Sequence, residues 1–268
     1  MRLASIVLAG TLLAGPAAWA QSPAEMHASY ATYAAGMEVA AVDADLLLGP
    51  YQYQVQLDYH ATGLLGFFNH GRQHDEVDGI WHAGQPEPHA YVATGIWHGT
   101  AHRTLIDYRH GDPVVRELEP PDTGRQPVPP NLQAHSVDTL SALALLIRQI
   151  ARTRACDASV RTFDGRRATE LSAHTAGWER LPQTGRSAYS GPALRCDFTS
   201  QVLAGFPTGS GGAKDHPPLH GSAWFAAIVP NGPPLPVRLR FETDWFGDAV
   251  TYLTAAGPGA PPQVAQQR

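Results

Sequence analysis

Apolar and polar side chains alternate along much of the chain. The stretch "YQYQVQLDYH", residues 51–60, shows the pattern most clearly, with Gln, Asp and His at every second position. Its apolar and aromatic members are Tyr51, Tyr53, Val55, Leu57 and Tyr59. Because successive side chains of a strand point to opposite faces, this stretch predicts a β-strand with one apolar and one solvated face.

The same alternation recurs between turn residues in both halves of the chain. Thr104, Ile106 and Tyr108 share one face of a predicted strand near the middle, before the turn sequence "HGDP". Near the end, Val237, Leu239 and Phe241 share a face in "LPVRLRFETDWFG". Asp164-Gly165 lies between two extended segments and predicts a type I′ hairpin. Short strands separated by turns are typical of an antiparallel meander.

One segment breaks the strand pattern with a helical period. Apolar residues recur at steps of three and four from Leu140 through Leu143 and Ile147 to Ile150. Asp138 precedes them as an N-cap whose carboxylate accepts the free amide protons of the first turn. The sequence therefore predicts a helix over about 138–152, packed on one side against the sheet. The Pro-rich residues 119–131 before it predict a crossing loop.

The two ends of the chain have different compositions from the middle. Residues 1–20 combine Arg2, a short apolar run and "AWA", which predicts a secretory signal peptide cleaved after Ala20. A membrane anchor is the alternative, but the apolar run is too short to span a bilayer. No cysteine lies near the cleavage point, so a soluble, periplasmic protein is expected. Residues 21–256 then form a single β-rich domain, followed by a disordered tail at 257–268.

Charge and cysteine content narrow the function classes. Removing residues 1–20 takes away one arginine, so the net charge becomes (19 − 1) − 24 = −6 with histidine neutral. A net negative charge does not favour binding to the phosphates of nucleic acids. Cys156 and Cys196 are the two cysteines, and in an exported chain they predict one disulfide. A reactive thiol or a metal-binding pair is the alternative.

The order of these features resembles the domain of unknown function 3108 family of exported bacterial proteins. The resemblance rests on "FDGRR" at 163–167, "GPALRC" at 191–196 and the helix start with Asp138, Ser141 and Ala142. It implies a strongly curved antiparallel sheet, an open or half-closed β-barrel, with the helix lying across its concave side. The resemblance implies no catalytic activity.

Histidine offers the main hint of chemistry. Eight of the thirteen histidines lie between residues 60 and 110, including the pairs His70/His74 and His98/His102. In a strand such pairs share a face but lie about 13 Å apart, too far for one metal ion. Solvent-facing histidines are the ordinary reading, and a metal-dependent hydrolase is kept as the weakest alternative. The sequence contains neither a nucleophile-elbow motif nor a phosphate-binding loop. We therefore expect no enzymatic activity and no bound cofactor.

The aromatic face of the sheet leaves two interpretations open, a packed core or a ligand groove. A curved sheet with one helix fills its concavity poorly, which favours a groove for an acyl chain or another amphipathic envelope molecule. The expected lining consists of Tyr51, Tyr53, Val55, Leu57, Tyr59, Ile106, Tyr108, Leu140, Leu143, Ile147, Leu239 and Phe241. The leading hypothesis is thus a non-enzymatic periplasmic envelope protein that binds such a molecule. The alternative is a structural module that binds an envelope protein partner in polysaccharide assembly, with its groove filled by the helix.

Overall fold

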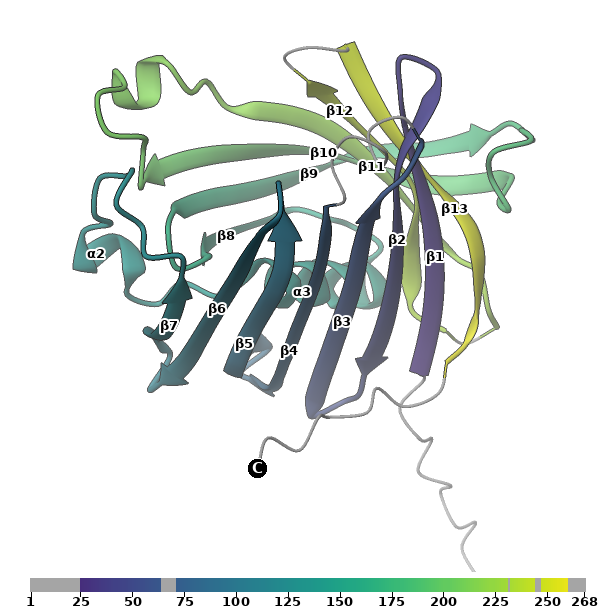
Figure 1. The fold of residues 1–268 in the computed structure, drawn as a ribbon. Helices are drawn as coiled ribbons and strands as arrows, with labels where there is room; N and C mark the ends of the chain where they lie inside the picture. The colour runs from purple at the N-terminus through teal and green to yellow at the C-terminus, as the bar shows by residue number, and fades with distance from the viewer. Residues whose placement is uncertain (1–24, 64–70, 231, 244–246, 260–268) are drawn as a thin grey trace, which may run out of the picture.

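Thirteen antiparallel strands form one continuous sheet in the computed structural model of the chain (Figure 1). The structure describes residues 25–63, 71–230, 232–243 and 247–259. The first seven strands are β1 (Glu25–Ala34), β2 (Met37–Leu48), β3 (Gln52–Ala61), β4 (Arg72–His82), β5 (Gln85–Trp97), β6 (Thr100–Arg109) and β7 (Asp112–Glu119). The other six are β8 (Ala158–Phe163), β9 (Ala168–Leu181), β10 (Gly191–Ala204), β11 (Leu219–Ala227), β12 (Pro234–Thr243) and β13 (Gly247–Pro258).

The order of the strands shows how the chain runs through the sheet. The chain starts in the middle of the sheet at β1 and proceeds strand by strand to the edge strand β7. It then crosses to the opposite edge, β8, and returns strand by strand to β13, which pairs with β1. The predicted meander and the predicted mainly β fold, an open or half-closed barrel, are therefore confirmed, and the observed barrel is nearly closed. The Pro-rich segment is the crossing loop between the two edges, as predicted.

The crossing carries the short helix α2 (Pro130–Gln133) and the long helix α3 (Thr139–Thr153). α3 packs against β3, β4, β5, β8 and β12, so it lies on the concave side of the sheet. In Figure 1 it is seen behind the lower part of β3, β4 and β5. Its buried face consists of Leu140, Ser141, Ala142, Ala144, Ile147 and Ile150. The helix and its position on the concave side agree with the sequence prediction.

Two connections hold the end of the crossing to the second half of the sheet. Val137 pairs with Thr162 of β8, so the residues before α3 extend the sheet by one bridge. After α3, Cys156 is disulfide-bonded to Cys196 of β10, across a sequence separation of 40 residues. The predicted disulfide is confirmed, and it fixes the carboxyl end of α3 to the sheet.

On the outer face, a ladder of arginine and aromatic side chains crosses four neighbouring strands. Arg195, Trp224, Arg238 and Tyr252 are partners in the registers of β10, β11, β12 and β13. The guanidinium carbons of Arg195 and Arg238 lie 5.6 and 4.9 Å from the Trp224 ring, and the indole nitrogen donates to Glu179 at 2.8 Å. Trp224 is only 5 % exposed, because these cations cover it.

Three sequence predictions about local structure need comment. In the hairpin after β8, Gly165 alone has a positive φ (+89°), which fits a type II′ turn and not the predicted type I′ turn. Gly257 and Pro258 are not part of a disordered tail, because they pair with His27 and Met26 of β1. The predicted signal peptide at 1–20 and residues 260–268 of the tail lie outside the described residues. Within the described part, no helix is long and apolar enough to cross a membrane.

The disulfide gives a first prediction. Replacing both Cys156 and Cys196 by serine should lower the free energy of unfolding by about 4 kcal/mol, the chain-entropy value for a loop of this length. Denaturant unfolding followed by circular dichroism measures it. Wild-type protein kept reduced during the measurement should lose the same amount. A loss in the serine variant without a loss in the reduced protein would contradict a role for the bond itself.

Candidate functional site

α3 fills the central part of the concave side, where the ligand groove was predicted. Tyr53, Val55, Ile106, Leu140 and Ile147 are at most 5 % exposed and belong to the core between helix and sheet. The partly buried members of the predicted lining that pack against this core are Leu57, Tyr108, Leu143 and Leu239, whereas Tyr59 and Phe241 are half-buried farther along their strands. Most of the predicted lining therefore comes together, but around the helix.

Tyr51 was wrongly placed in this lining. The residue precedes β3 and is 82 % exposed at the turn between β2 and β3. Its carbonyl accepts a hydrogen bond from the Trp81 amide, and the Gly49 amide donates to the Gln52 carbonyl. These bonds turn the chain, so the alternation of the strand starts one residue later than the sequence pattern indicates.

A buried polar cluster joins the first turn of α3 to the sheet. Asp138 accepts the Ser141 amide at 2.8 Å as the predicted N-cap, and the Ser141 hydroxyl donates to its other oxygen at 2.6 Å. The Tyr53 hydroxyl lies 2.8 Å from the Ser141 oxygen, which is free to accept from it. Burial raises the pKa of Asp138 to about 6, against the opposing effect of the bonds from Ser141. The three side chains form one hydrogen-bonded unit.

Unfilled space remains at the other end of the concave side. A cavity of about 190 Å³ lies between the upper ends of β4, β5 and β6 and the turn that joins β8 to β9. We call it the inner cavity. The side chains that line it are Gln73, Tyr91, Ala93, Thr94, Trp97, His102, Arg103, Thr104, Asp164, Arg166 and Arg167, together with Gly95. Its wall is thus aromatic on the sheet side and charged on the hairpin side.

The aromatic wall is built by the pairing of β3, β4 and β5. Trp97 stacks on Tyr59 with ring centroids 5.5 Å apart, and its indole nitrogen donates to Gln73 at 3.3 Å. A Cβ at Gly71 would come within 2.7 Å of the Trp97 ring, so a larger residue there would displace the indole. The ring is therefore held flat along the sheet beside the cavity.

A partly buried carboxyl lies next to this wall. The Gln73 amide donates to both oxygens of Asp75 at 2.8 Å. Burial raises the pKa of Asp75, with Gln73 acting in the opposite direction. Burial also raises the pKa of Tyr91, and the neighbouring Asp75 raises it further. Tyr91 is consequently neutral at physiological pH, and its side chain lines the cavity.

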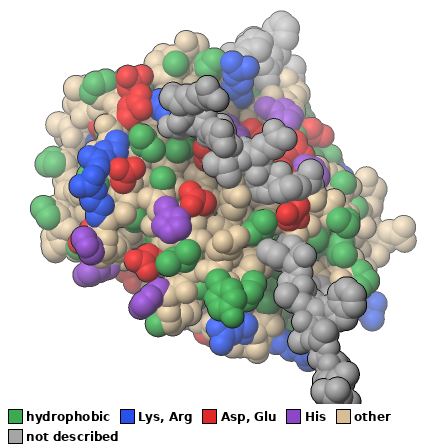
Figure 2. Space-filling view, turned by 90° about the horizontal axis from the view of Figure 1, so that it is seen from below, with side chains coloured by type: hydrophobic (Ala, Val, Ile, Leu, Met, Phe, Trp, Pro, Cys, Tyr) green, Lys and Arg blue, Asp and Glu red, His purple; other side chains and the backbone are tan. Residues whose placement is uncertain are grey.

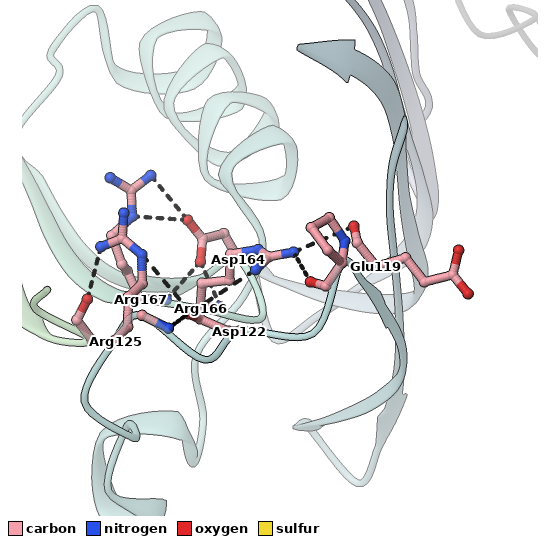
Figure 3. Close-up of polar contacts among 9 residues, drawn as sticks. Glu119, Asp122, Arg125, Asp164, Arg166 and Arg167 are labelled. Atoms are coloured by element: carbon pink, nitrogen blue, oxygen red, sulfur yellow. Dashed lines mark hydrogen bonds and ion pairs between the residues drawn. The ribbon is translucent and has the colours of Figure 1, made fainter. Parts of the chain in front are cut away.

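The charged wall is the turn of the "FDGRR" hairpin, shown in Figure 3. Asp164 accepts the amides of Arg166 and Arg167 at 2.8 and 2.7 Å, which fixes the turn. The Arg166 guanidinium donates to the carbonyls of Glu119 and Pro120 at 3.4 and 2.8 Å. It therefore ties the hairpin to the end of β7, across the opening between the two edges of the sheet.

The two arginines differ in how much of their donor capacity is used. Arg166 is occupied by the main-chain carbonyls and lies 4.0 Å from Asp122. Among the described residues, Arg167 forms an ion pair with Asp164 alone, at 3.2 Å, and its side chain is 46 % exposed. Of the two hairpin arginines, Arg167 is thus the one that has donors left for a ligand. From the sequence, this motif indicated only the hairpin turn and the family resemblance, and neither Trp97 nor Gln73 was in the predicted lining.

Two larger hollows lie on the outer side of the sheet. One, of about 650 Å³, crosses β3 to β7, and the other, of about 350 Å³, crosses β9 to β13. Both are lined by side chains that already pair with each other, such as His74 with Asp58 at 2.8 Å and Arg240 with Asp248 at 2.6 Å. The inner cavity is smaller but better suited to bind a ligand, because it combines aromatic surface with an arginine that has hydrogen-bond donors left.

The histidines do not converge on a metal site in the part of the chain that the structure describes. His27, His74 and His89 each lie 2.8 Å from one aspartate of a neighbouring strand, on the outer face. No three histidine, cysteine, aspartate or glutamate side chains of the described residues come together to hold an ion. His70, one member of the noted pairs, lies outside the described residues.

Comparisons with known proteins concern the family and the fold. Residues 27–254 match the family model described as "Protein of unknown function (DUF3108)". No curated protein matches the chain. A β-barrel-like protein of the domain of unknown function DUF1849 from Brucella abortus is 10% identical, with 87% of this chain and 97% of that chain covered and a TM-score of 0.48. A Bacteroides fragilis protein with a YmcC-like fold, provisionally described as exported, is 10% identical, with 88% and 96% covered and a TM-score of 0.33.

Asp138 gives a prediction with a defined sign. Its pKa is raised from 3.8 to about 6 on folding, so the folded chain binds more protons than the unfolded chain between these values. Stability contributed by the protonated carboxyl is therefore lost as the pH rises through this range. For Asp138→Asn, the free energy of unfolding relative to wild type should rise by about 2–3 kcal/mol between about pH 4 and pH 7. Urea unfolding at each pH measures the difference.

Asp157 is the matched control for this experiment. Hydrogen bonds from Thr175 lower the pKa of its carboxyl, so Asp157→Asn should change with pH in the opposite direction. A difference for Asp138→Asn that stays constant with pH would show that folding does not raise the pKa of this carboxyl.

The two hairpin arginines provide a further prediction. Arg166→Ala should speed hydrogen exchange in residues 118–126 and lower the free energy of unfolding by about 1–2 kcal/mol, because two carbonyls lose a charged donor. Hydrogen-exchange mass spectrometry measures the first effect. Arg167→Ala, one residue away, should leave exchange in 118–126 unchanged. Equal effects of the two substitutions would contradict the specific role of Arg166.

Proposed function

The chain belongs to the DUF3108 family of proteins of unknown function, and from that premise we propose that it is a periplasmic envelope protein that binds an amphipathic envelope molecule. The proposed ligand has an acyl chain and an anionic head group. The observation that carries the proposal is the inner cavity, an unfilled space with an aromatic wall on one side and Arg167 on the other. No catalytic role is assigned to any of its residues.

The chemistry of the cavity suits such a ligand in two ways. The flat faces of Trp97 and Tyr91 provide apolar contact area for hydrocarbon. Arg167 has donors left for a carboxylate or phosphate, and a hydrogen bond between two charged groups is stronger than a neutral one. At about 190 Å³ the cavity is smaller than typical ligand pockets, so it takes the head group and the first part of the chain.

The proposed compartment rests on the sequence and on the disulfide. Residues 1–20 have the composition of a secretory signal peptide. The bond between Cys156 and Cys196 is stable in an oxidising compartment and uncommon in a reducing one. Both features support export.

One observation favours the second candidate, a structural or partner-binding module without a small ligand. Leu140 and Ile147 are 5 % and 0 % exposed, so α3 fills the centre of the concave side. Under this alternative the inner cavity is a packing defect, and the outer face carries the function. Ligand binding by the inner cavity distinguishes the two candidates directly.

Native mass spectrometry tests the proposal. Protein recovered after export should bind octanoate, an eight-carbon fatty acid used below its micelle concentration, as a 1:1 complex. Arg167→Gln should weaken this binding at least about ten-fold, because the carboxylate loses a charged partner. Trp97→Ala should also weaken it, through lost contact with the chain.

Two controls keep the result specific. Tyr51→Ser removes an exposed aromatic far from the inner cavity and should leave octanoate binding unchanged. Circular dichroism and thermal unfolding check that each variant is folded. Absence of a complex with the wild-type protein, or unchanged binding in both cavity variants, would overturn the proposal and favour the partner-binding module.

A further inference from the structure

The turn between β2 and β3 presents an aromatic side chain whose exposure the core does not explain. Tyr51 is 82 % exposed, and its main chain is fixed by the hydrogen bond from the Trp81 amide at 2.9 Å. Ile80, which is 39 % exposed, faces Gln52 in the register of β3 and β4 and so lies beside this turn. Two apolar side chains thus project from a rigid part of the lower rim of the barrel.

Arginines of α3 extend this surface. The Arg148 guanidinium lies 4.4 Å from the Trp81 ring and donates to the carbonyls of Gly49 and Pro50 at 3.3 Å, directly behind Tyr51. Arg152 follows one helical turn later and is exposed. Burial and the neighbouring charge of Arg152 both lower the pKa of Arg148, so the two cations lie close enough to repel each other.

No carboxylate relieves this repulsion. Among the described residues, neither Arg148 nor Arg152 has an ion-pair partner, and Arg154 at the end of the helix has none either. Glu87 is opposite Ile80 in the register of β4 and β5 and has no ion pair with these arginines. In Figure 2, which looks at the molecule from below, hydrophobic side chains lie directly beside basic ones in the lower centre.

We propose that Pro50, Tyr51, Ile80, Arg148 and Arg152, here called the rim patch, dock the protein on an anionic bilayer surface. Tyrosine is favoured at the headgroup level of a membrane, where the ring is apolar and the hydroxyl stays wet. Arginines near an anionic surface are attracted to it, and the attraction decays within about a Debye length. The chain as a whole has a net charge of −5, so a local group of unpaired cations is needed for such contact.

The position of the rim patch makes it independent of the inner cavity. Tyr51 lies at the lower end of β3, whereas Trp97 lies at the upper end of β5, as Figure 1 shows for the two strand ends. A protein docked through the rim patch turns the opening of the cavity away from the bilayer. Loss of one activity is therefore not expected to remove the other.

Vesicle flotation tests the rim patch. Protein recovered after export, free of its leader, should float with vesicles of phosphatidylglycerol and phosphatidylethanolamine and remain behind with phosphatidylcholine vesicles. Arg152→Glu should weaken binding at least about ten-fold, because it replaces attraction by repulsion. Tyr51→Ser should weaken it several-fold, and raised salt should weaken binding of the wild type.

Trp178→Ser is the matched control, because Trp178 is another large exposed aromatic, 61 % exposed, on β9. It should leave vesicle binding unchanged. Thermal unfolding checks that the exposed substitutions leave the fold intact. Equal binding of the wild type to anionic and neutral vesicles, no binding to either, or an equal loss in Trp178→Ser would overturn the proposal. Binding to a protein partner with no lipid binding would also overturn it.

Discussion

The fold depends on how α3 is fixed inside a sheet that ends in two free edges. Such a sheet has to cover its concave face, and a single helix can do so only if its position is defined. At one end of the helix, Asp138 and Ser141 connect the first turn to Tyr53 through bonds of 2.6 to 2.8 Å. Burying this carboxylate has a free-energy cost, seen in its raised pKa, but each of its oxygens has a donor.

The other end of α3 is fixed by different chemistry. Arg148 lies on Trp81 and reaches the carbonyls of the turn between β2 and β3, while Cys156 holds the chain to β10 after the helix. With both ends fixed, the helix divides the concave side. Its centre is filled by residues such as Ile147, and the unfilled space is left near the hairpin turn. The two candidate binding surfaces therefore lie at opposite ends of one barrel.

The features that sequence predicted are those that a short segment determines by itself. Period-two alternation gave the strands, the spacing from Leu140 to Ile150 gave the helix, and Asp138 gave its first turn. The disulfide was predicted from the presence of two cysteines in a chain that is expected to be exported. By contrast, Tyr51 was misplaced because a turn delays the start of the alternation by one residue. That change depends on a hydrogen bond from Trp81, about thirty residues away, and no local pattern records it.

The inner cavity could not be predicted from the sequence either, because it also depends on contacts between residues far apart in the chain. Trp97 lies beside it because Gly71 leaves room for the ring and Tyr59 supports it, and this requires the register of three strands. The alternating arginines around Trp224 likewise appear only when four strands are aligned.

The "FDGRR" turn shows how one short motif divides its tasks. Asp164 shapes the turn, and Arg166 closes the opening beside β7 through two carbonyls, so both have structural duties that account for them. Arg167 has no such duty beyond its pair with Asp164, and it is the one that faces the inner cavity with donors to spare. Because Asp164 holds both arginines by their amides, the structural contact and the available cation are set by the same turn. A ligand bound at Arg167 would thus lie next to the Arg166 contact with Glu119 and Pro120, which joins the two edges of the sheet.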